Sequence, residues 1–142
     1  MKRWLSLILV LIVVAVGTFG VRHVLEQRAA HQREIAYQSA LRSYSERFRP
    51  GVTRREVEDY LRARNIRFQQ MCCVGHRLSK NVWDDLTRIG QERAPWYCSE
   101  NNVYVAFQFG GAERNRMVGS GSADPSDTLK AVSIHHWLEG CL

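Results

Sequence analysis

Four cysteines are the residues of this chain best suited to chemistry. Cys72, Cys73, Cys98 and Cys141 all follow an apolar N-terminal run, and an exported chain converts such thiols into disulfides. Four cysteines allow three pairings. A bond between the adjacent Cys72 and Cys73 would close a strained ring. We therefore expect Cys98 and Cys141 each to pair with a member of the 72–73 pair, so that the last strand is tied to the first.

Zinc is the other chemistry that thiolates and imidazoles support. The candidates beside the cysteines are His76, His135 and His136, but no C-x-x-C or H-x-x-x-H spacing is present. Adjacent strand residues point to opposite faces, so His135 and His136 cannot easily share one ion. His136 falls on the face of Val132 and Ile134, which predicts a hydrogen-bonded core residue. The sequence predicts no metal and no cofactor.

A thiol enzyme needs a nucleophile and a positioned base. Cys98 lies between aromatic residues in Trp96-Tyr97-Cys98-Ser99-Glu100, yet nothing marks a base for it. The adjacent Cys72 and Cys73 lack the C-x-x-C spacing of a redox motif. We expect a protein that is not an enzyme. The alternative is a thiol-dependent enzyme or redox protein that uses Cys98 or Cys72/Cys73.

The N-terminus predicts a membrane anchor. Residues 4–21 contain no charge, and eighteen helical residues span roughly 27 Å, close to the thickness of a bilayer core. Lys2 and Arg3 precede the run, which favours a cytoplasmic N-terminus. Residues 1–21 are thus predicted to be a single-pass signal-anchor in the cytoplasmic (inner) membrane, with the rest of the chain in the periplasm. A cleaved signal peptide is the rival hypothesis, and it also exports the remainder.

Residues 22–47 predict a helical stalk beside the membrane. The segment 22–48 lacks Gly and Pro, and its apolar positions form a narrow stripe: Ala30, Tyr37, Leu41, Tyr44 and Phe48. The stripe indicates a stalk whose last turns pack on the following domain. The alternative is a short coiled-coil seam, which Gln27 and Glu34 would interrupt.

The positive charge of the chain leaves a second alternative function open. The 142 residues carry a formal net charge of +6, and residues 28–67 hold ten Arg against five acidic residues. Such a surplus suits either a solvated helix face or contact with anionic lipid, as in a lipid-contacting structural stalk protein. No nucleic acid is expected as a partner, because the chain is predicted to be exported and shows no helix-turn-helix or aromatic RNA motif.

Residues 48–142 predict a small extracytoplasmic α+β domain. Thr53 and Glu56 form a capping box for a helix over 53–64, and Asn65 suits its left-handed end. Period-two alternation follows, most clearly over 103–109. The other strands are expected over 66–73, 86–89 and 130–138. Successive strands without intervening helices predict a three- to four-stranded antiparallel sheet with the helix packed on one face.

The sheet also supplies the candidates for binding a protein partner. If the alternate residues Val103 to Phe109 face the helices, the residues between them lie on the opposite face. Exposed aromatic residues there would form a protein-binding patch, unless the Trp residues fill the edges of the domain. The partner-binding candidates are Tyr104, Gln108, Trp83, Trp96 and Trp137.

The helix opening Phe48-Arg-Pro-Gly-Val-Thr-Arg-Arg-Glu-Val-Glu-Asp-Tyr-Leu61 resembles that of the BamE-like (SmpA/OmlA) envelope domains. Their pattern is x-x-Gly-hydrophobic-Thr-x-x-Glu-Val, and the β-lactamase-inhibitor-like modules share the architecture. The resemblance covers about residues 48–142. It implies three or four antiparallel strands after the helix, in an exported binding module without catalysis. The chain lacks the lipidated cysteine of that family.

Overall fold

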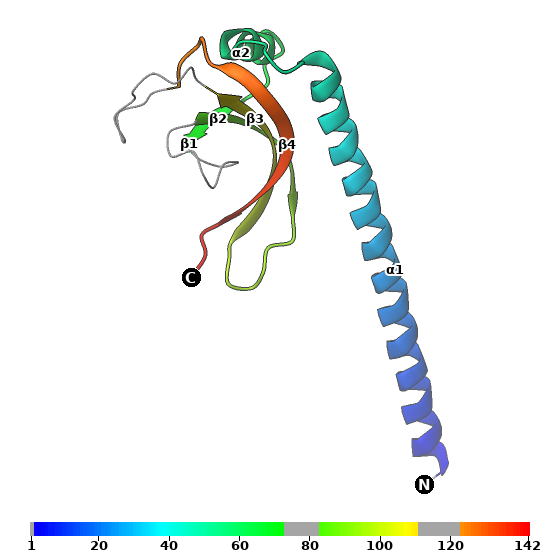
Figure 1. Ribbon diagram of the computed structural model, residues 1–142. Coiled ribbons are helices and arrows are strands. Elements are labelled where there is room, and N and C mark those ends of the chain that lie inside the picture. The colour runs from blue at the N-terminus through cyan, green and yellow to red at the C-terminus, as the bar shows by residue number, and fades with distance from the viewer. Residues whose placement is uncertain (1, 73–82, 111–122) are drawn as a thin grey trace. The chain divides into compact units, whose positions relative to one another are not determined.

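The computed structural model describes residues 2–72, 83–110 and 123–142, of which residues 2–15 and Cys72 are described by backbone alone. The chain forms two compact units, Met1–Ala36 and Tyr37–Leu142. Figure 1 shows a long helix, a short helix and a curved sheet.

Helix α1 spans Lys2–Arg47 without interruption. The helix predicted over 22–47 is therefore confirmed, and it continues the helical backbone of the apolar run. Among the residues open to description, no helix is both long enough and apolar enough to cross a membrane. The side chains of residues 1–15, which make up most of the predicted anchor, lie outside the described part, so the anchor stays a prediction.

The last turns of α1 belong to the second unit and pack on its sheet. Tyr37 and Phe48 are buried, with 4% and 5% of their surface exposed. The ring of Phe107 in the sheet receives Tyr44 edge-on, with 5.3 Å between centroids, and contacts Phe48 in the same way. The ring of Tyr37 lies so close to Gly90 that a Cβ there would come within 2.6 Å of it. Only glycine allows this approach. Tyr37, Tyr44 and Phe48 of the stripe thus make the contact of the helix with the domain, whereas Ala30 is exposed.

Helix α2 spans Arg54–Ala63 and confirms the predicted helix and its cap. The Thr53 hydroxyl accepts the Glu56 N–H, and the Thr53 N–H donates to the Glu56 carboxylate at 2.9 Å. Asn65 takes a φ of 56° just after the helix, as expected for its left-handed end. Val57 and Leu61 are fully buried and attach α2 to the sheet.

The four strands are β1 (Gln69–Cys72), β2 (Trp83–Glu92), β3 (Glu100–Gly110) and β4 (Thr128–Glu139). They pair antiparallel in the order β1-β2-β3-β4. The α+β prediction is therefore confirmed as helix packed on a four-stranded antiparallel sheet. Two strand limits were wrong. Strand β1 starts three residues after Ile66, because Ile66 and Phe68 pack on the core first, and β2 is ten residues long.

The core lies between the helices and one face of the sheet. On β3 the alternation Val103, Val105, Phe107 and Phe109 faces the helices, and all four are fully buried. Leu129 of β4 completes the cluster. The predicted orientation of β3 is confirmed.

A cluster of charged side chains is buried within this layer. Arg54, at the start of α2, is fully buried and donates hydrogen bonds to Asp85 and to the Trp83 carbonyl in β2. Its guanidinium lies 3.6 Å from Asp127 and 4.1 Å from the centre of the Phe109 ring. The Arg54 N–H also donates to the Asp127 carbonyl at 2.8 Å. One arginine thus joins the helix start, the start of β2 and the turn before β4.

Candidate functional site

The cysteine pair lies at the end of the sheet that carries the C-terminus. Cys98 and Cys141 form a disulfide with an S–S distance of 2.05 Å. The prediction that each would pair with the 72–73 pair is therefore wrong. The reason is strand register: Glu100 of β3 pairs with Glu139 of β4, so positions 98 and 141 continue the same ladder. The bond ties β4 to β3 and not to the first strand. Cys73 lies outside the described residues.

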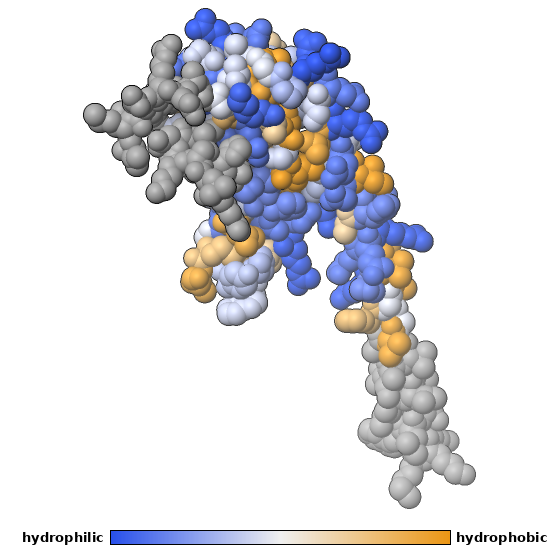
Figure 2. Space-filling view, viewed as in Figure 1, coloured by the Kyte–Doolittle hydropathy of each residue, from blue (hydrophilic) through white to orange (hydrophobic). Residues whose placement is uncertain are grey.

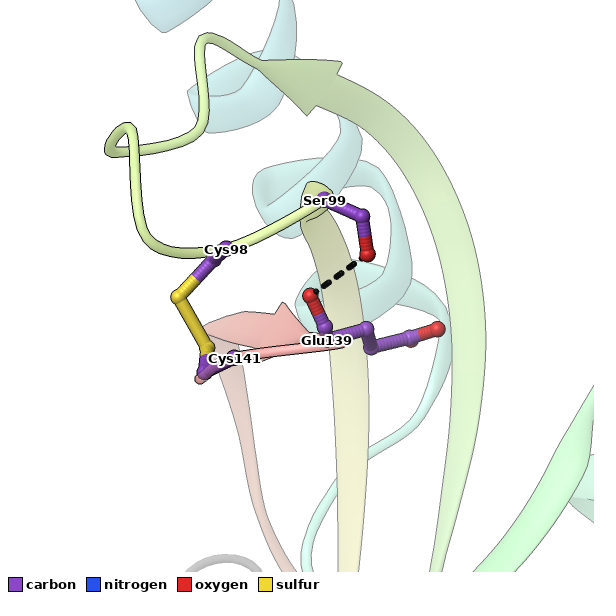
Figure 3. Close-up of a disulfide and its surroundings, with 4 residues drawn as sticks. All are labelled: Cys98, Ser99, Glu139 and Cys141. Carbon is purple, nitrogen blue, oxygen red and sulfur yellow. Dashed lines mark hydrogen bonds between the residues drawn. A yellow bond between two sulfur atoms is a disulfide. The ribbon is translucent and has the colours of Figure 1, made fainter.

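Backbone contacts fix the chain around this disulfide. Figure 3 shows Ser99 beside the bond, with its hydroxyl donating to the Glu139 carbonyl at 3.1 Å. The Leu142 N–H donates to the Tyr97 carbonyl at 2.9 Å. Gly140 turns the chain with a φ of 59°, and a Cβ there would collide with the Ser99 hydroxyl at 2.0 Å. The connection before β3 and the C-terminus are thus held as one rigid end.

An apolar groove lies at this end. We call it the tip groove; its volume is about 680 Å³, and its walls are Arg93, Ala94, Pro95, Trp96, Asn101, His136 and Leu138. Trp96 is 90% exposed and meets the Tyr97 ring edge-on at 5.8 Å. Leu138 is 41% exposed and Leu142 fully exposed. Figure 2 shows pale and orange residues gathered at this end of the sheet. The volume is in the range of ligand pockets.

His136, a wall residue of the tip groove, is paired with Glu92. His136 Nδ1 lies 3.8 Å from Glu92 Oε2, and the two side chains are 47% and 32% exposed. The predicted core position of His136 is therefore wrong. His136 does share a sheet face with Val132 and Ile134. Alternation along a strand predicts the face on which a residue lies, but it does not predict how far along the strand the helices cover that face.

Two other predicted partner-binding residues, Tyr104 and Trp137, lie on the sheet face opposite the helices, which we call the distal face. Tyr104 is buried there with Leu86 and Ala106, and Met71 and Trp137 pack against them. The Tyr104 hydroxyl donates to Glu139 at 3.2 Å.

Of the last two candidates, Gln108 shares the distal face with Tyr104, whereas Trp83 shares the face of Asp85, towards the helices. Gln108 donates to the Ser133 hydroxyl at 3.0 Å, and Trp83 begins β2. Strand register therefore separates the candidates: only Trp96 belongs to the tip groove.

Two side chains of the distal face, Tyr104 and His135, have shifted pKa values. Burial raises the pKa of the Tyr104 phenol, the Glu139 carboxylate raises it further, and Arg88 lowers it. Burial lowers the pKa of His135, and the neighbouring His136 lowers it too. The His135 ring centre lies 5.8 Å from that of Trp137. Both groups are therefore predominantly neutral at neutral pH.

Three side chains that could take part in catalysis, Cys98, Arg54 and Asp85, are either in the disulfide or buried. Cys98 carries no thiol, because it is in the disulfide. Arg54 and Asp85 expose no surface to a substrate. Within residues 2–72, 83–110 and 123–142, no three His, Cys, Asp or Glu side chains are placed to hold a metal ion.

Comparisons of the chain with protein-family models, curated proteins and solved structures find no match.

Proposed function

We propose that this chain is a membrane-anchored, extracytoplasmic protein-binding module of the bacterial envelope, without catalytic activity. In this proposal residues 4–21 hold the chain in the cytoplasmic membrane, and residues 22–47 extend it into the periplasm. The resemblance to BamE-like domains suggests an envelope role. The disulfide between Cys98 and Cys141 favours an oxidising compartment, because thiols in the cytoplasm are kept reduced.

The observation that carries the proposal is the exposure of Trp96. A side chain of this size that is 90% in water beside Tyr97 and Leu138 forms an apolar patch, which on a protein surface marks an interaction site. Trp and Tyr are also the residues most enriched at binding hot spots. The disulfide and the Ser99 contacts hold the patch rigid, so little conformational entropy is lost on binding.

Site-specific photo-crosslinking in intact cells tests the proposal. We expect a benzophenone amino acid at position 96 to give a discrete adduct with one partner protein. The same probe at Arg55, an exposed residue of α2, serves as the matched control and should give none. Adding Leu138→Asp to the position-96 probe should weaken the adduct at least tenfold, because it places a charge in the apolar groove. Equal adducts from positions 96 and 55, or none from either, would contradict the proposal.

A further inference from the structure

Strand β2 has a free edge. Its residues Trp83 to Leu86 pair with β1, but β1 is only four residues long. Residues Thr87–Glu92 pair with β3 on one side, and no described strand pairs with their other side. An edge of this kind presents unpaired N–H and C=O groups, onto which an extended peptide can add as a further strand.

A cavity lies where this free edge meets the start of β1. Its volume is about 230 Å³, and Arg67, Phe68, Gln69, Leu86, Arg88 and Tyr104 line it. Strand register places Gln69 opposite Leu86, and Arg88 opposite Tyr104, so these four side chains share the distal face. Phe68, Leu86 and the Tyr104 ring are thus its apolar part, and Arg67 and Arg88 form a cationic rim beside Gln69.

The two rim arginines carry charges that the described residues leave without an ion pair. Arg88 donates to the neutral Gln91 amide at 2.9 Å. Within the described part of the chain, no carboxylate forms an ion pair with Arg67 or Arg88, and both side chains are exposed. Glu139 of the distal face accepts a hydrogen bond from the Tyr104 hydroxyl. Guanidinium groups bind carboxylates through paired hydrogen bonds, so the rim is complementary to a carboxylate.

The direction of a strand added to β2 decides which kind of carboxylate the cationic rim would bind. A strand added antiparallel to β2 runs in the direction of β1. It starts opposite Glu92 and ends opposite Thr87, beside Arg67 and Arg88. Ile89 is an extra residue in the register with β3, and such a bulge limits regular pairing to a short stretch. A short added strand that stops at a cationic cavity matches a chain end.

We infer that this edge is a second binding site, distinct from the tip groove, that captures the C-terminus of an extended partner peptide. The last residues of the peptide pair with β2 from Glu92 towards Thr87. The terminal carboxylate binds Arg67 and Arg88, and the last side chain, which is apolar, enters the cavity over Leu86 and Tyr104.

Fluorescence anisotropy with the full chain in detergent micelles tests this inference. The probe is fluorescein-Gly-Thr-Val-Thr-Val-Leu with a free carboxyl end. We expect the free acid to bind at least tenfold more tightly than its C-terminal amide, because the amide forfeits the charge-assisted bonds. Arg67→Gln and Arg88→Gln should each weaken the free acid about tenfold and leave the amide unchanged. The matched control is Arg55→Gln, which should bind as the wild type does.

Three outcomes would overturn the inference. These are equal affinity of acid and amide, full affinity of Arg88→Gln, and equally tight binding by an amidated peptide whose last residue is Glu. Thermal unfolding of each variant establishes that the fold is retained, since both arginines are exposed. The crosslink from position 96 tests a different surface, so the two proposals stand or fall separately.

Discussion

Asp85 is the residue at which burial and charge conflict most. It is fully buried in β2, and its pKa is raised overall from 3.8 to about 7, chiefly by burial. The Arg54 guanidinium lowers this pKa, but Glu58 and Asp84 oppose it. Arg54 also faces Asp127. A single cation is therefore shared among several carboxyl groups, and a proton on Asp85 relieves their repulsion.

The sign of the pH effect follows from proton counting. Below about pH 4 Asp85 is protonated in the folded and the unfolded chain. Between about pH 4 and pH 7 the unfolded chain loses this proton while the folded chain keeps it, so the free energy of unfolding falls. Above pH 7 the carboxyl is ionised in both states and its contribution stays constant.

We therefore predict that Asp85→Asn removes this slope. Relative to the variant, the wild type should lose up to about 4 kcal/mol of unfolding free energy between about pH 4 and pH 7. Urea unfolding followed by Trp fluorescence at several pH values measures the difference. Asp59→Asn is the control, since Asp59 is 65% exposed and should keep the wild-type profile. A parallel slope in Asp85→Asn would refute the assignment.

At the scale of the element, α2 shows how local chemistry sets a boundary. The first N–H groups of a helix have no partner within it. Here Thr53 supplies the cap, while the carbonyls of Pro125 and Asp127 accept from Arg55 and Arg54. The helix start is thus shared between a local capping box and the turn before β4.

Of these contacts, only the capping box uses side chains, so only the capping box can be tested by a substitution. Thr53→Ala should lower the free energy of unfolding by about 1 kcal/mol, because the Glu56 N–H loses its acceptor. The hydrogen bonds from Thr53 also hold the pKa of Glu56 below its ordinary value. Thr53→Ser keeps the hydroxyl and should retain most of the stability. Urea unfolding of the two variants is the measurement, and an equal loss in both would contradict the capping assignment.

The elements also show what a sequence can and cannot predict. The cap of α2 and the alternation of β3 were predicted because each rests on residues a few positions apart. Strand β2 was underestimated because Asp84 and Asp85 interrupt its apolar pattern. They are buried, and the partner of Asp85 is Arg54, 31 residues earlier in the chain. A contact of that range cannot be read from local spacing.

The candidate site was predicted only in part, for the same reason. Trp96 was identified by residue type, but its neighbour His136 was assigned to the core by alternation. The pairing of Cys98 with Cys141 depends on the register of β3 and β4, which the sequence does not state. Residue type thus indicated that Trp96 belongs to a binding surface. The other residues of that surface are brought together only by the three-dimensional structure.

At the scale of the whole molecule, the disulfide reports on the compartment. We predict that the full chain in intact cells has Cys98 linked to Cys141, whereas a chain lacking residues 4–21 keeps both as thiols. Alkylation before lysis, followed by peptide mass spectrometry, distinguishes the two. Alkylated Cys98 in the full chain would contradict the proposed export. Closing a loop across 43 residues stabilises the fold by about 4 kcal/mol in the chain-entropy model.

The bond between Cys98 and Cys141 also determines how the domain responds to force. Without a closing link, a pull on Leu142 would peel β4 from β3 one hydrogen bond at a time. The covalent bond carries that load into the connection before β3, where Ser99 already binds Glu139. The ladder of β3 and β4 would then have to break in concert. A partner that pulls on the tip groove would therefore act on a mechanically closed end.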